Sequence, residues 1–377
     1  MTTTNPGVLG CPSTYTCFVY YRGGRGRPVG VLDNTTLITW DRKLNNTGEA
    51  AVTIAAGQAS YGCCSLMNTL AQDEAVRAYE LHIYRDRSRV WCGPITQVSE
   101  TRGPTNAVFN VAARDVLAYV DDYGHWLSVG YNLSGDLVTI ATSILGVDLL
   151  TDDPNMSSHI VATPSGITAT QAAASESGSV LGEINKLVSL GLRYTTSNRA
   201  IYLGGLLGNA FGAPIRLSVD DIAGDVTILH DGTVFANTIF GGSGTASAQT
   251  PNGAVPPPDP QLITLGGPEP GWRGRVEHGV SATAGTGGTT GQSAVLAAAQ
   301  AAYFTGRRPR LVRVADGSVV SPNASVTVPQ LIPGTLVKVA GADRFCTWVA
   351  QDLQLVRVTG SFDSTGEKIG VSLGPVG

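Results

Sequence analysis

The chain is short of charge. Charged residues make up 14% of its 377 residues, against about 25% in an average globular protein. Soluble monomers normally cover themselves with charge, so the scarcity indicates either surface that is hidden in an assembly or a neutral surface of Ser, Thr and Asn. At this length the chain can bury a real core and form two or three domains.

Long apolar runs are also missing. No stretch approaches the roughly 18 apolar residues that a membrane-spanning helix needs. Residues 1–6 carry neither the charged nor the apolar segment of a secretory signal. We therefore expect a protein that is made and at first kept in a cytoplasm, with no stable membrane association.

Positive charge is scarce as well. The net charge is −4, which argues against a nucleic-acid binder, because such proteins need a basic patch. The few lysines among many arginines indicate a genomic base bias more than a function. The one dense basic cluster, Arg307-Arg308-Pro309-Arg310, is expected to be a loop before a strand or a charged contact with a partner.

The six cysteines lack the C-x-x-C spacing of a zinc site. Cys11 and Cys17 could close a small disulfide or supply two ligands, but buried reduced thiols that act as small hydrophobic residues are the favoured interpretation. The adjacent Cys63 and Cys64 are expected to be packing residues. The other two are Cys92 and Cys346.

Catalytic motifs are absent too. The five histidines are far apart and are expected to be surface or capping residues: His82, His125, His159, His230 and His278. The run Gly241–Gly244 fails the spacing of a nucleophile elbow. Asp152-Asp153 is expected to lie in a turn. Asp220-Asp221 is expected to end a strand and to cap the turn that follows. We therefore predict no enzyme and no catalytic, cofactor-binding or metal-binding residue.

Glycine and proline are abundant, at 47 and 20 residues, which favours many turns and short strands. In residues 79–84 the side chains alternate like those of a half-buried strand. A turn at Asp86-Arg87-Ser88 follows, and Gly93-Pro94 should bend the next strand, because proline cannot donate to a central ladder. Strands are expected at 17–21, 37–40, 50–54, 79–84, 89–92, 95–100 and 107–112, with a short helix within 64–76.

The period changes after residue 120. Apolar residues at helical spacing predict helices near 137–145 and 180–188. Ser134 is placed to cap the first helix and Gly146 to end it, and Gly191 should stop the second. A hairpin is expected over 192–203, with its turn at Ser197-Asn198-Arg199.

Strand patterns return after residue 214. Asp231-Gly232 between two alternating runs, 225–229 and 234–240, predicts a hairpin. Further strands are expected at 215–219, 310–314, 336–339, 353–358 and 368–373, and an alanine-rich helix at 294–304. Residues 241–260 and 279–292 are rich in Gly, Ser, Thr and Pro and should form long flexible loops.

These patterns predict a mainly β fold with an α+β insert. The expected domains are a β-barrel-like unit at 1–120, an α+β domain at 121–205 and a second β-barrel-like unit at 206–377.

Several motifs, in their order along the chain, resemble the tail-hub (minor tail) proteins of long-tailed siphoviruses. The VWCGPI strand at 90–95 and the segment 113–117 carry the resemblance, as do the two middle helices with their hairpin. The motifs at 217–226, 309–311 and 331–334 also fit that family. The bias toward arginine resembles phages of actinobacteria.

The resemblance implies two tail-tube-like β-barrels joined by smaller domains, in a homotrimer whose six barrels form a pseudo-six-fold ring. Such a ring would join the tail tube or distal tail protein to the tip in the virion and would pass DNA only transiently. Tape measure and tip or fibre proteins would be its other partners. The resemblance gives no metal ligands, because the cysteines do not match a pattern.

Two other functions stay open at this stage. A receptor- or carbohydrate-binding tail adhesin would expose aromatic residues on loops, and Trp126 and Trp272 are the candidates. A secreted hydrolase would need two carboxylates across a cleft, and we consider it the weakest of the three.

Overall fold

The computed structural model describes most of the chain. The described residues are 13–55, 61–72, 76–102, 107–121, 130–146, 159–173, 178–205, 211–230, 236–242, 263–266, 277–281, 299, 310–342 and 348–376.

The N-terminal part folds as the sequence predicts, into antiparallel strands with one short helix. The predicted helix lies slightly earlier in the chain than expected and spans Tyr61–Leu70. Its elements are β1 Tyr15–Tyr21, β2 Gly30–Leu32, β3 Thr35–Lys43, β4 Glu49–Ala55, α1 Tyr61–Leu70, β5 Tyr79–Arg85, β6 Ser88–Arg102, β7 Ala107–Arg114 and the 3₁₀ helix η2 Val116–Tyr119. Positive φ angles at Asp86 and Arg87 confirm the predicted turn between β5 and β6.

Strand β6 changes partner along its length. Its first half pairs with β5 and its second half pairs with β7. The change occurs at Gly93-Pro94, where β6 lies so close to β7 that a Cβ on Gly93 would stand 1.8 Å from the carbonyl oxygen of Arg114. Only glycine permits this approach. A bulge between Ile95 and Gln97 completes the bend.

The middle of the chain forms the predicted α+β unit around its own apolar core. Both predicted helices are present, and Gly146 is the C-cap of the first. The predicted N-cap is wrong: Asp136, not Ser134, accepts the capping hydrogen bond, because Ser134 lies in a strand and contacts Thr170. The elements are β8 Tyr131–Asp136, α2 Leu137–Leu145, β9 His159–Ala162, β10 Thr168–Ala173, α3 Val180–Ser189, β11 Leu192–Ser197 and β12 Ala200–Gly205.

The C-terminal part is again β structure, and the predicted closing strands are confirmed. The predicted helix at 294–304 lies outside the described residues, apart from Ala299. The elements are β13 Ile215–Ser218, η4 Val219–Asp221, β14 Ile222–Ala223, β15 Val226–His230, β16 Thr238–Gly242, β17 Ile263–Gly266, β18 Glu277–Ser281, β19 Arg310–Val314, β20 Ser318–Val320, η5 Val328–Gln330, β21 Leu336–Ala342, β22 Trp348–Asp363 and β23 Gly366–Pro375.

The predicted hairpin around Asp231-Gly232 is wrong. Strand β15 pairs with β19, and β16 pairs with β17 and β18. Alternation shows which face of a strand is apolar but does not identify its partner, which is chosen by long-range packing. Strands also extend into both predicted loops, since β16 ends at Gly242 and β18 includes residues 279–281. The rest of those loops lies outside the described residues.

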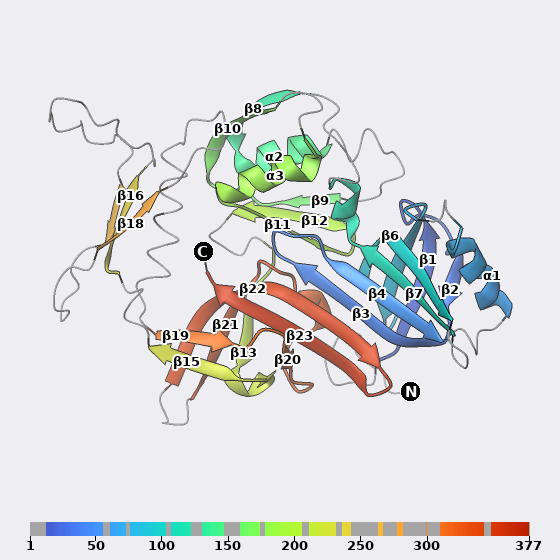
Figure 1. Cartoon of the computed structure of the whole chain (residues 1–377). Coiled ribbons are helices and arrows are strands. Elements are labelled where there is room, and N and C mark those ends of the chain that lie inside the picture. The colour runs from blue at the N-terminus through green and yellow to red at the C-terminus, as the bar shows by residue number, and fades with distance from the viewer. Residues whose placement is uncertain are drawn as a thin grey trace.

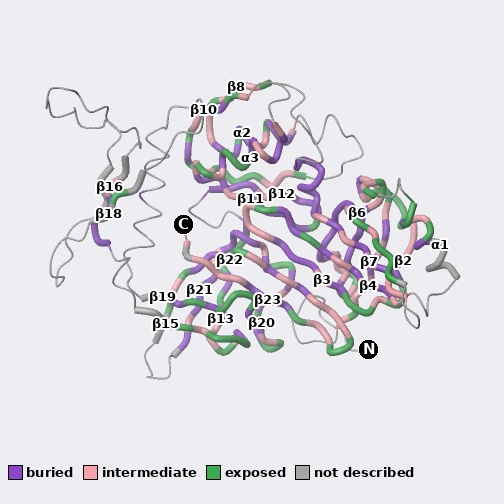
Figure 2. Tube along the Cα trace, viewed as in Figure 1, coloured by how far each residue is buried: buried purple, intermediate pink, exposed green. Residues whose placement is uncertain are grey.

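One 13-stranded sheet connects the two ends of the chain. Strand β3, near the N-terminus, pairs over residues 38–43 with β22, near the C-terminus, and the two run side by side in Figure 1. A single apolar core lies against this sheet, seen as the buried segments of β3 and β4 in Figure 2. The α+β unit lies above the sheet in the same view. The mainly β fold with an α+β insert is thus confirmed.

Candidate functional site: the joints between units and the exposed sheet face

The described part of the chain offers no metal centre. Within it, no group of three or more His, Cys, Asp and Glu side chains could hold a metal ion. Cys17 and Cys92 are buried free thiols, as the sequence predicts, and burial raises their pKa values to about 12 and about 11. Such thiols are poor nucleophiles at neutral pH.

Among the described helices, none has the length and apolarity required to cross a bilayer.

The sequence interpretation of β5 as half-buried is wrong, because both of its faces are covered. Leu81 and Ile83 point into the main core, while Glu80 and His82, 0% and 1% exposed, point the other way. The turn between β11 and β12 brings Arg199 over these polar residues. His82 is therefore a buried residue, not the surface or capping residue that the sequence predicted.

Glu80 is the centre of a buried polar cluster, which we call the Glu80 cluster: Glu80, His82, Tyr119 and Arg199. One carboxylate oxygen accepts from the Tyr119 hydroxyl at 2.6 Å and from the Gly23 amide at 2.9 Å. The other accepts from His82 Nε2 at 3.0 Å and from the Arg199 guanidinium. The cluster therefore ties β5, η2 and the loop after β1 to the α+β unit.

The pKa values in this cluster favour an ionised Glu80 beside a neutral His82. Burial acts to raise the pKa of Glu80, but the hydrogen bond from His82 and the charge of Arg199 outweigh it and lower that pKa. Burial lowers the pKa of His82 against the opposing effect of Glu80, and Arg89 and Arg199 lower it further. A neutral His82 that donates from Nε2 leaves Nδ1 without a hydrogen-bond partner among the described residues.

This arrangement predicts destabilisation by acid. A depressed pKa stabilises the fold above the group's ordinary value, 6.5 for His82 and 4.5 for Glu80, and that contribution is lost as pH falls through the folded value. As pH falls below 7 we expect wild type to lose more melting temperature than His82→Gln, because only wild type carries the contribution of His82. Thermal melts of both proteins across this range check it, and parallel curves would contradict the assignment.

Asp115 makes a second buried joint to the same hairpin. Its carboxylate accepts from the Gly48 and Leu117 amides at 2.6 and 2.9 Å and from Thr196 Oγ1 at 2.7 Å. Burial raises its pKa to about 6 although these donors oppose the rise. Strand β11 also bonds to the β3–β4 turn, where the Asn45 amide donates to the Tyr194 carbonyl at 2.8 Å. The α+β unit is thus fixed to the N-terminal unit by several polar contacts.

Arg42 joins the N- and C-terminal units. Its buried guanidinium donates to the carbonyl oxygens of Val90 at 2.5 Å and Leu331 at 3.1 Å. Burial lowers its pKa to about 10, so it stays charged at neutral pH. Arg85 makes a second tie, with Nε 2.6 Å and Nη2 2.8 Å from the Glu367 carboxylate. Two-point pairing of this kind is the strong form of an ion pair.

The outward face of the shared sheet is lined by small, mostly neutral side chains. Ser361, Thr39, Ala51 and Ala112 follow one another in register across β22, β3, β4 and β7. A hollow of about 530 Å³ lies over this region. Charges at its rim are paired, with Arg357 Nη2 2.6 Å from the Asp41 carboxylate and Lys43 Nζ 3.4 Å from it.

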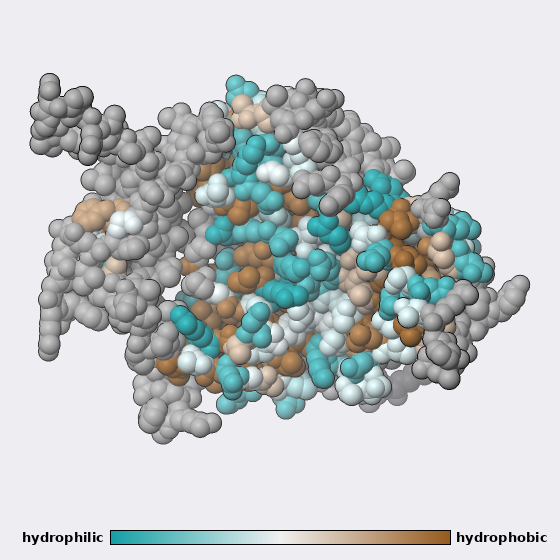
Figure 3. Space-filling view, viewed as in Figure 1, coloured by the Kyte–Doolittle hydropathy of each residue, from teal (hydrophilic) through white to brown (hydrophobic). Residues whose placement is uncertain are grey.

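The described part of the surface carries few large apolar side chains. Among the described residues, the large hydrophobic side chains that are exposed are Tyr21, Leu37, Val76 and Val356. Figure 3 shows the described surface as a mixture of hydrophilic, neutral and scattered hydrophobic patches. This distribution fits the neutral surface that the low charge predicted as one of two alternatives.

The other residues singled out in the sequence are structural or lie elsewhere. Asp221 accepts from the Ser218 amide at 2.8 Å in a capping box, as predicted for that acidic pair. Arg310 begins β19, as expected for a basic loop before a strand. His159, the first residue of β9, is exposed as the sequence predicts. Several candidates lie outside the described residues: Cys11, Cys346, His125, Trp126, Trp272, Asp152-Asp153 and Arg307–Pro309.

No protein-family model matches the chain, and a search of curated proteins finds no relative by sequence. Solved structures do match it over almost its whole length. The 43 kDa tail protein of prophage MuSo2 from Shewanella oneidensis superposes with a TM-score of 0.58 at 14% identity, covering 96% of this chain and 98% of that one.

Two other tail proteins give similar values. Tail protein gp18 from Listeria monocytogenes has a TM-score of 0.55 at 13% identity, covering 95% of this chain and 94% of its own. A tail protein from Neisseria meningitidis has a TM-score of 0.54 at 11% identity, covering 95% and 96%. The chain therefore has the fold of these phage tail proteins.

Proposed function

We propose that this chain is a structural protein of a phage tail tip, with no enzymatic role. It would be a baseplate hub subunit that forms a homotrimeric ring between the tail tube or distal tail protein and the tip. The observation that carries the proposal is the likeness to prophage tail proteins, which extends over 96% of the chain. Fold alone does not fix function, so the chain's own surfaces have to support the role.

The exposed sheet face is our candidate for the channel lining. A channel that passes DNA without holding it needs a wall that does not attract phosphates. The row from Ser361 to Ala112 offers small neutral side chains, and the nearby cations Arg357 and Lys43 are paired with the carboxylates of Asp41 and Glu49. Three copies would supply three such rows, each spanning both β units of its subunit.

The polar joints support the same role. A ring that transmits force between tube and tip needs subunits whose parts do not move against one another. The Glu80 cluster and Asp115 fix the α+β unit, and Arg42 and Arg85 fix the C-terminal unit. Because each joint uses buried, hydrogen-bonded charge, its geometry is specific.

The finer assignments belong to the proposal as well. These are a siphovirus of actinobacteria, tape measure and tip or fibre proteins as neighbours, and a place in the virion after synthesis in the host cytoplasm. No observation on the described residues favours the adhesin alternative, whose tryptophans lie outside them.

The trimer is directly testable. Sedimentation velocity of the full chain should show a species of three times the 39.1 kDa subunit mass, with the subunit fraction falling as concentration rises about a hundredfold. Mixing with the tail tube protein from the same genome should give a larger ring complex. A subunit that stays monomeric throughout, alone and with that protein, would contradict the hub proposal.

A further inference from the structure

The loop between β1 and β2 is rich in arginine and has no acid near it in the sequence. Arg22, Arg25 and Arg27 are separated by glycines, and residues 1–32 contain no Asp or Glu. We call residues 22–28 the arginine loop. Arg25 and Arg27 are exposed, and among the described residues neither makes a hydrogen bond or an ion pair. The loop therefore presents two positive charges that the described part of the subunit does not pair.

The arginine loop is held in place by its own backbone. The Arg22 amide donates to the Ala78 carbonyl at 2.9 Å, and the Gly23 amide donates to the Glu80 carboxylate at 2.9 Å. Gly24, with a φ of 62°, packs so closely on the Glu80 cluster that a Cβ there would stand 2.8 Å from Glu80 Oε2. A loop that is fixed in this way loses little conformational freedom when a partner binds.

An exposed apolar patch lies at the foot of the arginine loop. Tyr21 is 60% exposed and Val76 is 42% exposed, more than any other large hydrophobic side chain among the described residues. The Tyr21 ring centre lies 5.5 Å from that of Tyr79. The hydrogen bond from Arg22 to Ala78 brings the segment that carries Val76 beside the start of the loop. Tyrosine and arginine are enriched among the residues that carry the binding energy of protein interfaces.

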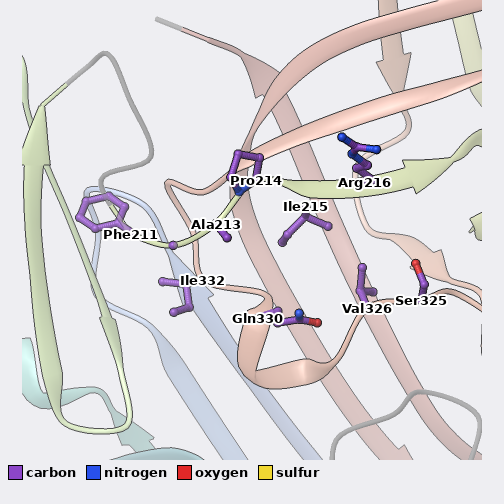
Figure 4. A pocket seen from close by; sticks show the side chains of 10 residues that line it. Phe211, Ala213, Pro214, Ile215, Arg216, Ser325, Val326, Gln330 and Ile332 are labelled. Carbon is purple, nitrogen blue, oxygen red and sulfur yellow. The ribbon is translucent and has the colours of Figure 1, made fainter.

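The cations beside β13, on the C-terminal unit, differ because acids offset them. Arg216 and Lys338 line a hollow of about 490 Å³ together with Asp221, and Asp352 is in register with Lys338. The smaller hollow at the start of β13 lies between that strand and residues 325–332 and, at about 250 Å³, has room for one side chain (Figure 4). By contrast, the two exposed cations of the arginine loop have no acid paired with them among the described residues.

We propose that the arginine loop and the adjoining Tyr21 form a docking surface for an acidic segment of another protein. Carboxylates of that segment would pair with Arg25 and Arg27, and one of its apolar side chains would pack on Tyr21 beside Val76. The exposed ion pairs would supply association rate and specificity, and the apolar contact would supply affinity.

A protein suits this surface better than a nucleic acid does. Nucleic-acid sites need an extended basic patch, whereas this loop offers two free cations on a chain with a net charge of −4. Strands β1 and β2 also lie at the opposite end of the sheet path from β22 and β23. They form the right-hand edge of Figure 1, away from the sheet face that we propose for the DNA channel. The inference goes beyond the hub proposal and holds for a single subunit.

The probe for the test is a short fluorescein-labelled peptide of glutamate and leucine, and fluorescence anisotropy with the full-length protein measures its binding. Arg25→Gln/Arg27→Gln should weaken binding about tenfold, and Tyr21→Ser should weaken it by about as much. The matched control, Arg87→Gln/Arg313→Gln, removes the same charge from two other exposed arginines and should change nothing. Arg87 lies in the β5–β6 turn, at the other end of β5 from the loop, and Arg313 lies on β19.

A second arm distinguishes the other occupants. Fluorescein-labelled single-stranded DNA of similar length should bind more weakly than the peptide at the same ionic strength. Melting temperatures of the variants should match wild type, because each substituted side chain is exposed. The proposal is overturned if the peptide does not bind, if both double variants weaken binding equally, if Tyr21→Ser has no effect, or if the DNA binds more tightly. It is also overturned if Arg25→Gln/Arg27→Gln loses self-association in sedimentation velocity, since the occupant would then be a second copy.

Discussion

Replacing Arg199 with methionine should lower the free energy of unfolding by about 3–5 kcal/mol, the usual range when one partner of a buried ion pair is removed. Arg199 is 4% exposed and Glu80 is 0% exposed. Without the guanidinium, the Glu80 carboxylate keeps its donors from His82, Tyr119 and Gly23 but loses its compensating charge. Urea denaturation followed by circular dichroism measures the change.

The control for this prediction is Arg313→Met. Arg313 is exposed on β19, so its loss should change stability by less than about 1 kcal/mol. The double variant Glu80→Gln/Arg199→Met should recover part of the loss, because no charge is then left unpaired. If Arg199→Met has as little effect as Arg313→Met, the Glu80 cluster does not hold the α+β unit in place.

Gly93→Ala should be about as damaging, with a loss of about 3 kcal/mol or more, or no soluble protein. The added Cβ would stand 1.8 Å from the Arg114 carbonyl oxygen. Because that oxygen belongs to backbone at the end of β7, the clash cannot be relieved by a side-chain rotation. The strands have to separate where β6 changes partner. Thermal melting and the yield of soluble protein give the result.

Gly146→Ala is the matched control for Gly93→Ala. Gly146 has a helical φ of −66°, and a Cβ there would meet nothing within 4 Å. The alanine should be neutral or slightly stabilising, since it reduces the freedom of the unfolded chain. Equal melting temperatures for the two alanine variants would mean that β6 and β7 do not approach closely at Gly93.

Local pattern was sufficient for most elements of this protein. The period-2 runs gave the strands at 17–21, 50–54 and 107–112, and the helical spacing gave the helices of the α+β unit. The role of Gly146 as the C-cap of α2 and the capped turn at Asp220-Asp221 were also predictable. In each case the cause lies within a few residues: side chains that share a face, or a cap that satisfies nearby backbone groups.

The candidate site was not predictable in this way. Nothing around Glu80 indicates that its neutralising partner is Arg199, 119 residues further along the chain. A polar residue on an alternating strand reads as solvent-facing, and the alternation gives no sign that a distant turn will cover it. Only the low overall charge was visible from the sequence, and it left open where the charged residues would be placed.

The sequence by itself determined where the chain is extended, where it is helical and which faces are apolar. The tertiary structure alone decided that β3 pairs with β22 and that β15 pairs with β19 rather than with β16. The reason is physical: the conformation of a segment depends on its own residues. The choice of a pairing partner depends on which distant surfaces can bury apolar area and satisfy polar groups together.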